Sequence, residues 1–341
     1  MIVFYIVSLF SLFFARLAEK KQSLLLFVFS ALCLALLCGL RAENVGTDTH
    51  TYTTIFETIQ SGGLHFDSDI GFYYIVKFII GFTNSVPLTF ALISIITVSF
   101  IYYTIWYYRR QGSISFMVFI FICFFYPQMF NIVRQMLALA VVFAATTQLE
   151  QKRPFVFCLI LALATSIHIS SLVCVGFLAV HILQNLKNKP IIFYMVVVLF
   201  LVFFIYFYSS VTLIYDTRFA YMQEDYQTTL GYEVLAQLIT LVFLMISNYK
   251  IIKNDAEYTR ISIFCIIGIV LSVITANAGE ASRIAYFYTI YYILFAAVVL
   301  KDLPNRAIGY WGFFLLGLLN FVYRISVSGW YGIYPYSMTN L

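Results

Sequence analysis

Long apolar runs alternate with short polar segments along almost the whole chain. A helix needs about 20 apolar residues to cross the hydrocarbon core of a bilayer, and shorter helices are tolerated inside a bundle. The runs are apolar on every face, unlike the alternating strands of a membrane β-barrel. The pattern predicts transmembrane helices near residues 1–16, 24–40, 88–108, 113–126, 128–149, 154–168, 169–186, 190–210, 233–249, 260–276, 284–300 and 307–323.

Residues 70–84 form a shorter apolar segment, which we expect to be a re-entrant or interfacial helix rather than a crossing. The predicted fold is therefore all-α, a polytopic membrane bundle of about 12 transmembrane helices. Residues 1–341 form one transmembrane domain. Its outer parts are expected to be loops near 41–70 and 211–232 and a C-terminal tail at 324–341.

The composition indicates a membrane protein. Apolar residues make up 62% of the chain and charged residues 10%, and the mean hydropathy is +0.93. An ordinary soluble domain is only about half apolar and about a quarter charged. The 6 cysteines all lie in apolar runs without metal-ligand spacing, so we interpret them as packed thiols.

The basic residues predict the orientation, because cytoplasmic loops of membrane proteins are enriched in Lys and Arg. If the N terminus is outside and 70–84 does not cross, both termini lie outside and most basic residues fall in cytoplasmic loops. The exceptions are Arg41, Lys77, Arg134, Arg218, Arg283 and Arg324. Since the arginine fork binds phosphate or carboxylate through two hydrogen bonds, this set suggests an anionic ligand that arrives from the outer side.

A dense polar segment, Leu40 to Tyr52, follows the second apolar run. In so apolar a chain, such a cluster is either a solvated loop or a functional site. Within it, Asp48 is a candidate general base. A carboxylate among hydroxyl groups could also bind a divalent cation, but the spacing matches no calcium loop and no carboxylate cluster joins it. We therefore expect no metal.

Arg134 belongs to a second polar segment, Tyr126 to Gln135, in which Pro127 is expected to open a helix. Asn131, Arg134 and Gln135 would then share one face of its first turns, where the helix dipole also favours an anion. The alternative is that Arg134 reaches the outer headgroups as an ordinary interfacial arginine.

His168 lies among hydroxyl-bearing residues between two predicted helices, on the outer side. A lone histidine is often only a packing residue. Here the polar surroundings make it a candidate general base, since an imidazole exchanges protons near neutral pH.

Three further groups are candidates on the outer side. Glu280 and Arg283 are spaced for an ion pair in a short loop. Arg324 precedes an aromatic tail that we interpret as an interfacial anchor or a lid. Arg218 belongs to the loop at 215–232, which is either a substrate clamp or an ordinary surface loop.

These motifs resemble the EpsG family, within the wider group of Wzy-type polysaccharide polymerases. The resemblance covers nearly the whole chain in order and spacing. Its motifs are Leu40-Arg41…Val45-Gly46-Thr47-Asp48-Thr49…Tyr52, Asn131-x-x-Arg134-Gln135, His168-x-Ser170, Arg283 after a short outer loop, and the terminal Tyr334-Pro335-Tyr336.

The resemblance implies an inverting glycosyltransferase at the outer face of a bacterial inner or plasma membrane. Since arginines can stabilise a diphosphate without a metal, we expect no metal or other cofactor. An acceptor hydroxyl on a lipid-linked repeat unit attacks the anomeric carbon of a growing glycan, and undecaprenyl diphosphate leaves. The implied partners are undecaprenyl-diphosphate-linked oligosaccharide and polysaccharide, membrane lipid and a chain-length regulator, with no nucleic acid. The product would be O-antigen, capsule or exopolysaccharide.

This reaction requires stabilisation of the diphosphate and removal of a proton from the acceptor hydroxyl. We assign Arg134 and Arg283 to the diphosphate, with Arg41 and Arg324 in support. His168 is the expected base, Asp48 is the alternative, and Glu280 would orient Arg283. Supporting substrate contacts are expected from Asn131, Gln135, Arg218 and Tyr52.

Two other functions share this chemistry. An O-antigen ligase uses the same lipid-diphosphate donor with a different acceptor. A flippase for lipid-linked oligosaccharides would also need an anion site, but we would expect charged groups through the depth of its bundle and an internal repeat.

Overall fold

The computed structural model describes residues 2–63, 69–185, 248–275, 283–327, 329 and 332–339. Within these residues every regular element is a helix, and the single β-type contact is an isolated bridge between Arg41 and Met338. The predicted helix at 190–210 and nearly all of the one at 233–249 lie outside the described residues. The all-helical prediction is confirmed for the described part of the chain.

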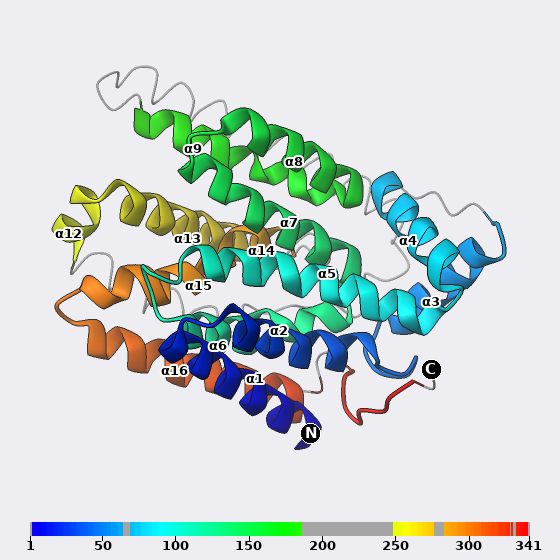
Figure 1. Cartoon of the computed structure of the whole chain (residues 1–341). Helices are drawn as coiled ribbons and strands as arrows, with labels where there is room; N and C mark the ends of the chain where they lie inside the picture. The colour runs from blue at the N-terminus through cyan, green and yellow to red at the C-terminus, as the bar shows by residue number, and fades with distance from the viewer. Residues whose placement is uncertain are drawn as a thin grey trace.

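The helices lie largely alongside one another in an elongated bundle (Figure 1). In chain order they are α1 (Ile2–Lys21), α2 (Leu24–Gly39), α3 (Thr49–Gln60), α4 (Ile70–Thr83), α5 (Val86–Tyr107), α6 (Ile114–Phe124), η1 (Tyr126–Phe130), α7 (Val133–Glu150), α8 (Pro154–Ile167), η2 (Ile169–Cys174), α9 (Val175–Asn185), α12 (Tyr249–Asn254), α13 (Ala256–Ile274), α14 (Tyr286–Thr289), α15 (Tyr292–Leu294), η5 (Phe295–Val299), η6 (Leu300–Asp302), α16 (Arg306–Val322) and η7 (Tyr323–Val327).

Several of these helices have the length and apolarity of membrane spans. Within the described residues, five are long enough to cross a bilayer: Ile2–Lys21, Val86–Tyr107, Ala256–Val273, Arg283–Asp302 and Arg306–Ser326. Shorter apolar helices occur at Leu24–Gly39, Ile70–Thr83, Ile114–Phe124, Pro154–Ile167 and Ile169–Leu183. The chain is therefore an apolar helical membrane protein, while the number of 12 crossings stays a prediction.

Helix α7 forms the centre of the bundle (Figure 1). It is buried at almost every position, and its many alanines allow neighbouring helices to approach closely. A helix that is apolar all round is stable only when it is surrounded. Because α7 is fixed on all sides, the residues at its first turn are held in place relative to α5, α8 and α14.

Helix α4 has two different faces. Ile70, Tyr74, Phe78 and Phe82 recur at every fourth position and are exposed, with Phe78 and Phe82 at 79% and 84%. The opposite face packs against α3, α5 and α8. So large an exposed apolar stripe is stable in contact with lipid, so we place α4 in or against the membrane.

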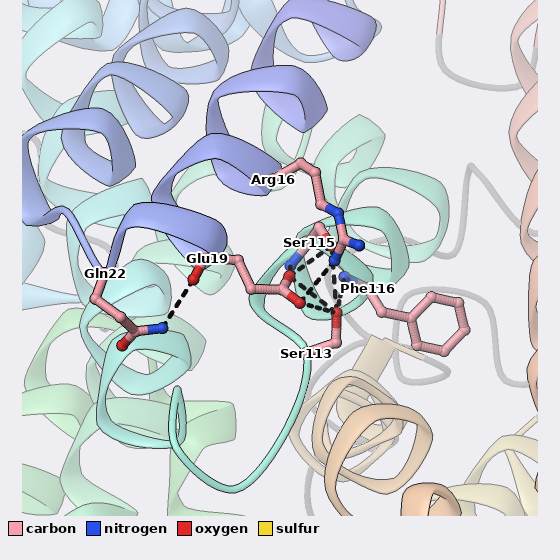
Figure 2. Close-up of polar contacts among 6 residues, drawn as sticks. All are labelled: Arg16, Glu19, Gln22, Ser113, Ser115 and Phe116. Carbon is pink, nitrogen blue, oxygen red and sulfur yellow. Dashed lines mark hydrogen bonds and ion pairs between the residues drawn. The ribbon is translucent and has the colours of Figure 1, made fainter.

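One end of the bundle is joined by polar contacts between helix ends. Figure 2 shows Glu19, near the end of α1, at the start of α6. Its carboxylate accepts from the Ser115 backbone N–H at 2.8 Å, the Ser115 hydroxyl at 2.6 Å and the Ser113 hydroxyl at 3.0 Å. It thereby satisfies a backbone donor that the first turn of a helix leaves unpaired.

Glu150, at the end of α7, makes a similar connection to α13. The Arg260 Nε atom donates to Glu150 Oε1 at 2.9 Å, and a second contact joins Nη2 to Oε2. This end of the bundle thus uses carboxylates to hold pairs of helices together.

The structure corrects several predicted boundaries. The helix expected at 128–149 begins only at Val133, because Pro127 opens the 3₁₀ turn η1 rather than an α-helix, so Asn131 lies before α7. The predicted outer loop at 41–70 contains helix α3. The helix expected at 284–300 is divided into α14, α15 and a π-helical turn, where Gly268 of α13 allows close contact with the Thr289 backbone.

Candidate active site

Helices α3 and α4 lie together at one end of the bundle (Figure 1). Three side chains from distant parts of the sequence meet directly before α4. A single carboxylate oxygen, Oδ2 of Asp69, lies 3.1 Å from Nη1 of Arg134 and 3.1 Å from Nδ1 of His168. The Asp69 side chain is only 6% exposed, whereas Arg134 is 25% and His168 15% exposed. A carboxylate, a guanidinium and an imidazole therefore form one partly open cluster.

Asp69 immediately precedes α4, yet its side chain does not cap that helix. Its Oδ1 atom instead accepts from the backbone N–H of Ile169 at 3.4 Å. Gly71 makes this approach possible, because a Cβ atom at this position would lie 2.2 Å from Ser166 Oγ and 2.8 Å from the Ser166 carbonyl carbon. Only glycine leaves room for the first turn of α4 to pack directly on the end of α8.

His168 lies at the break between two helices. Helix α8 ends at Ile167, His168 is extended (φ −156°, ψ 119°), and η2 begins at Ile169. The Nδ1 atom is directed to Asp69, which favours the tautomer with its proton on Nδ1 and a lone pair on Nε2. The lone pair of Nε2 in this tautomer can accept a proton.

Opposing effects act on the pKa of Asp69. Burial raises it, while the hydrogen bond and electrostatic attraction of His168, the charge of Arg134 and the N–H of Ile169 lower it. The lowering effects together exceed the effect of burial, so the pKa lies below the ordinary aspartate value. Asp69 is thus a carboxylate at neutral pH, able to accept from both neighbours.

Arg134 is held from the other side by Tyr52 of α3. The backbone N–H of Arg134 donates to the Tyr52 hydroxyl at 3.4 Å, and the guanidinium carbon lies 5.8 Å from the centre of the Tyr52 ring. Tyr52 is itself buried. A cation over an aromatic face is attracted to it, so Tyr52 limits where the guanidinium can point.

Gln135 connects this cluster to the segment before α14. Its Nε2 atom donates to the backbone carbonyl of Arg283 at 2.8 Å. The main chain of Arg283 is therefore fixed beside the first turn of α7, one residue along from Arg134. Two of the arginines predicted to bind diphosphate thus come from segments that are in contact.

The loop of residues 46–48 is held against the segment that precedes α7. The Asn131 side-chain oxygen accepts from the Thr47 backbone N–H at 2.9 Å. Gly46 has a φ of +94°, and a Cβ there would lie 2.7 Å from the Phe130 carbonyl oxygen. Both its backbone angle and its surroundings therefore require glycine. Asn131 acts here as a connection between segments.

Arg41 is almost fully buried, with 3% of its surface exposed. It donates to the Cys38 carbonyl at 2.7 Å and to the Thr49 hydroxyl at 2.9 Å, and its guanidinium lies over the rings of Phe90 and Phe130. These contacts join the end of α2 to the start of α3. The geometry gives Arg41 a structural position, and its predicted diphosphate contact stays untested.

The comparison with known families decides the identity of the chain. The model of the EpsG family matches residues 24–338. The chain belongs to the EpsG family. The resemblance seen in the sequence is confirmed, and with it a Wzy-type, polymerase-like membrane protein. No curated protein and no solved structure matches the chain.

The other predicted site residues of this EpsG-family chain are Asp48, Arg324, Glu280 and Arg218. The Asp48 carboxylate accepts from its neighbour, the Thr47 hydroxyl, at 2.9 Å. Arg324 lies in η7, after α16. Glu280 and Arg218 are not among the described residues. Their roles stay predictions.

Sequence reasoning missed Asp69. It lies only one residue before a short apolar helix, in a segment interpreted as part of an outer loop. The signal in the sequence was a carboxylate directly before an apolar run on the predicted outer side. Its partner His168 lies 99 residues away in sequence, so the sequence did not connect the two. Only the packing of α4 on α8 reveals the pairing.

Proposed function

We propose that this EpsG-family protein is a membrane polysaccharide polymerase that transfers a growing glycan from undecaprenyl diphosphate to a lipid-linked repeat unit. The observation that carries the proposal is the shared contact of Asp69 with His168 and Arg134. It joins a proton acceptor and an anion-binding group, which supply the two functions that this reaction requires.

In the proposed reaction, His168 Nε2 accepts the proton of the acceptor hydroxyl as its oxygen attacks the anomeric carbon. The bond from that carbon to the diphosphate oxygen breaks, and its electron pair leaves with the lipid diphosphate. Arg134, with Arg283 beside it, stabilises the charge that develops there. Attack opposite to the leaving group inverts the anomeric centre. Arginines can supply this stabilisation without a metal ion.

We further propose that the cluster faces the outside of a bacterial inner or plasma membrane, in a topology of about 12 crossings with both termini outside. The distribution of basic residues supports this orientation. The helix ends at the opposite end of the bundle carry Lys20 and Lys21 of α1 and Arg260 of α13. Labelling of single cysteines by a membrane-impermeant reagent tests it: Thr47→Cys should react from outside intact cells, and Lys21→Cys only after permeabilisation.

The deciding assay combines purified protein with lipid-linked repeat units in detergent or vesicles. A ladder of lengthened glycans is the expected result. Transfer of a glycan to lipid A core or peptidoglycan would indicate a ligase instead. Movement of the lipid across vesicles without a new glycosidic bond would indicate a flippase.

A further inference from the structure

The Asp69 carboxylate holds a guanidinium and an imidazole through one oxygen atom. Arg134 Nη1 and His168 Nδ1 both lie 3.1 Å from Oδ2, while Oδ1 accepts from the Ile169 backbone. The guanidinium of Arg134 partly neutralises the negative charge of Asp69. Less of that charge is then left to stabilise the protonated form of His168. In this arrangement Asp69 supports His168 only weakly as a base.

A bound diphosphate would change how the charge of Asp69 is shared between Arg134 and His168. A diphosphate carries more negative charge than a carboxylate and matches the arginine fork. Arg134 is 25% exposed whereas Asp69 is 6% exposed, so the arginine can turn toward a ligand while the carboxylate stays fixed. Gly71 and the N–H of Ile169 keep Asp69 beside His168 in either case.

We propose that Asp69 is a positioning residue that couples diphosphate binding to the basicity of His168. In the resting protein Asp69 holds both Arg134 and His168. When the lipid diphosphate of the substrate engages Arg134, the full charge of Asp69 acts on the Nδ1–H of His168, and Nε2 becomes a stronger base. Proton removal is thereby favoured only when the leaving group is already bound. This inference rests on the proposed function, because it assigns His168 and Arg134 the same roles.

Such coupling is reciprocal: if diphosphate releases Asp69 to His168, then Asp69 must oppose diphosphate binding at Arg134. Removing the carboxylate should therefore have opposite effects on rate and affinity. For Asp69→Asn we expect kcat to fall by about 10²–10⁴-fold and the affinity for farnesyl diphosphate, used as a soluble probe, to rise by about tenfold. Asp69→Glu should recover part of the rate.

The matched control is Glu43→Gln, which removes an exposed carboxylate paired with His50 at the same end of the bundle. It should leave both quantities unchanged. If Asp69→Asn weakens farnesyl diphosphate binding, Asp69 merely supports Arg134 and the coupling is wrong. If its kcat equals that of the wild type, the coupling is also wrong, although polymerase activity that depends on His168 and Arg134 would still support the proposed function. Full activity in His168→Gln and Arg134→Gln would instead reject the roles given to these two residues, and a purified wild type that lengthens no glycan would reject the proposed function itself.

A second measurement uses the unmodified active site, in case Asp69→Asn does not fold. Protein with ¹⁵N-labelled histidine reports the Nδ1–H signal of His168, assigned with His168→Gln. Farnesyl diphosphate should move this proton downfield in the wild type, as its hydrogen bond to Asp69 strengthens, and should leave it unchanged in Arg134→Gln. An unchanged signal in the wild type at saturating ligand would overturn the coupling.

Discussion

The two ends of the bundle use the same residue types for different purposes. At one end, Glu19 and Glu150 each connect the end of one helix to the start of another. At the other end, Asp69 is buried between an arginine and a histidine that both remain partly exposed. The carboxylates at the first end are satisfied by the helices they join.

This difference shows that residue type alone does not identify a reactive group. Glu19 accepts from a backbone N–H and two hydroxyls of one helix start, which fixes a packing arrangement. Asp69 accepts from an arginine and a histidine, to which we assign roles on the substrate. A carboxylate that only joins helices differs from one in a candidate active site in its partners. In the candidate site, the partners carry further hydrogen-bonding atoms and are partly exposed to solvent.

The largest expected effect tests whether the histidine at the Asp69 end is reactive. His168→Gln removes the proposed base, so kcat for glycan lengthening should fall by about 10²–10⁴-fold. The control is His181→Gln, on α9. That histidine is partly buried, and its Nδ1 has no hydrogen-bond partner among the residues that the structure describes. Product ladders from purified, folded protein give the comparison, and equal losses in both variants would remove the distinction between the two histidines.

The next effect concerns the arginine fork. Arg134→Lys keeps the positive charge but loses the paired donors, and one well-placed donor to a developing charge is worth about 10²–10³-fold in rate. The same change at Arg283 should also reduce the rate. Arg109→Lys is the control, because Arg109 contacts the carbonyl and ring of Trp106 at the end of α5. Normal polymerisation by both Arg134→Lys and Arg283→Lys would contradict their assignment.

A stability effect is expected at the opposite end. Glu150→Gln leaves Arg260 without its carboxylate, and breaking a buried ion pair costs about 3–5 kcal/mol when it is fully enclosed. Here 19% and 11% of the two side chains are exposed, so a loss on the order of 2 kcal/mol is expected. Unfolding in detergent should shift while turnover per folded molecule stays the same. A selective loss of turnover would mean that this end also takes part in the reaction.

A smaller effect on stability and turnover tests how the packing of α4 positions Asp69. Gly71→Ala puts a methyl group into the contact between α4 and Ser166, with an overpacking cost of about 1–3 kcal/mol and a displacement of Asp69 from His168. Gly81→Ala, on the same helix, serves as the control, because apart from its chain neighbours and its own helix backbone no described residue has an atom within 4 Å of the added Cβ. Thermal unfolding and turnover should both decline in the first variant only.

The smallest effect is the pH dependence of stability. Since the folded-state pKa of Asp69 is depressed, its stabilising contribution is fully present above the ordinary value of about 3.9 and is lost as the pH falls through the lower folded value. The difference in unfolding midpoint between the wild type and Asp69→Asn should therefore be constant near neutrality and diminish below about pH 4. If the difference in unfolding midpoint grew on acidification, the folded-state pKa of Asp69 would be raised rather than lowered.

Much of the fold could be predicted from apolar runs, because in a membrane each run must form a helix to satisfy its own backbone. The predicted helix boundaries were wrong where a local feature interrupted an apolar run. Pro127 starts a 3₁₀ turn, so α7 begins at Val133. Helix α3 was hidden in a polar segment, since its amphipathic pattern gives no long apolar run. For the site, Arg134 and His168 were visible as polar groups in apolar surroundings, but their common partner was not.

The sequence by itself determined that this is a helical membrane protein of the EpsG family, since hydropathy and the order of motifs are properties of the linear chain. Tertiary structure alone decided which polar groups meet. Asp69 reaches His168 because Gly71 lets two helices touch at their ends, and Arg41 is enclosed by aromatic rings because α2, α3 and α5 converge there. Contacts of this kind depend on the packing of helices that are distant in sequence, and no local pattern records them.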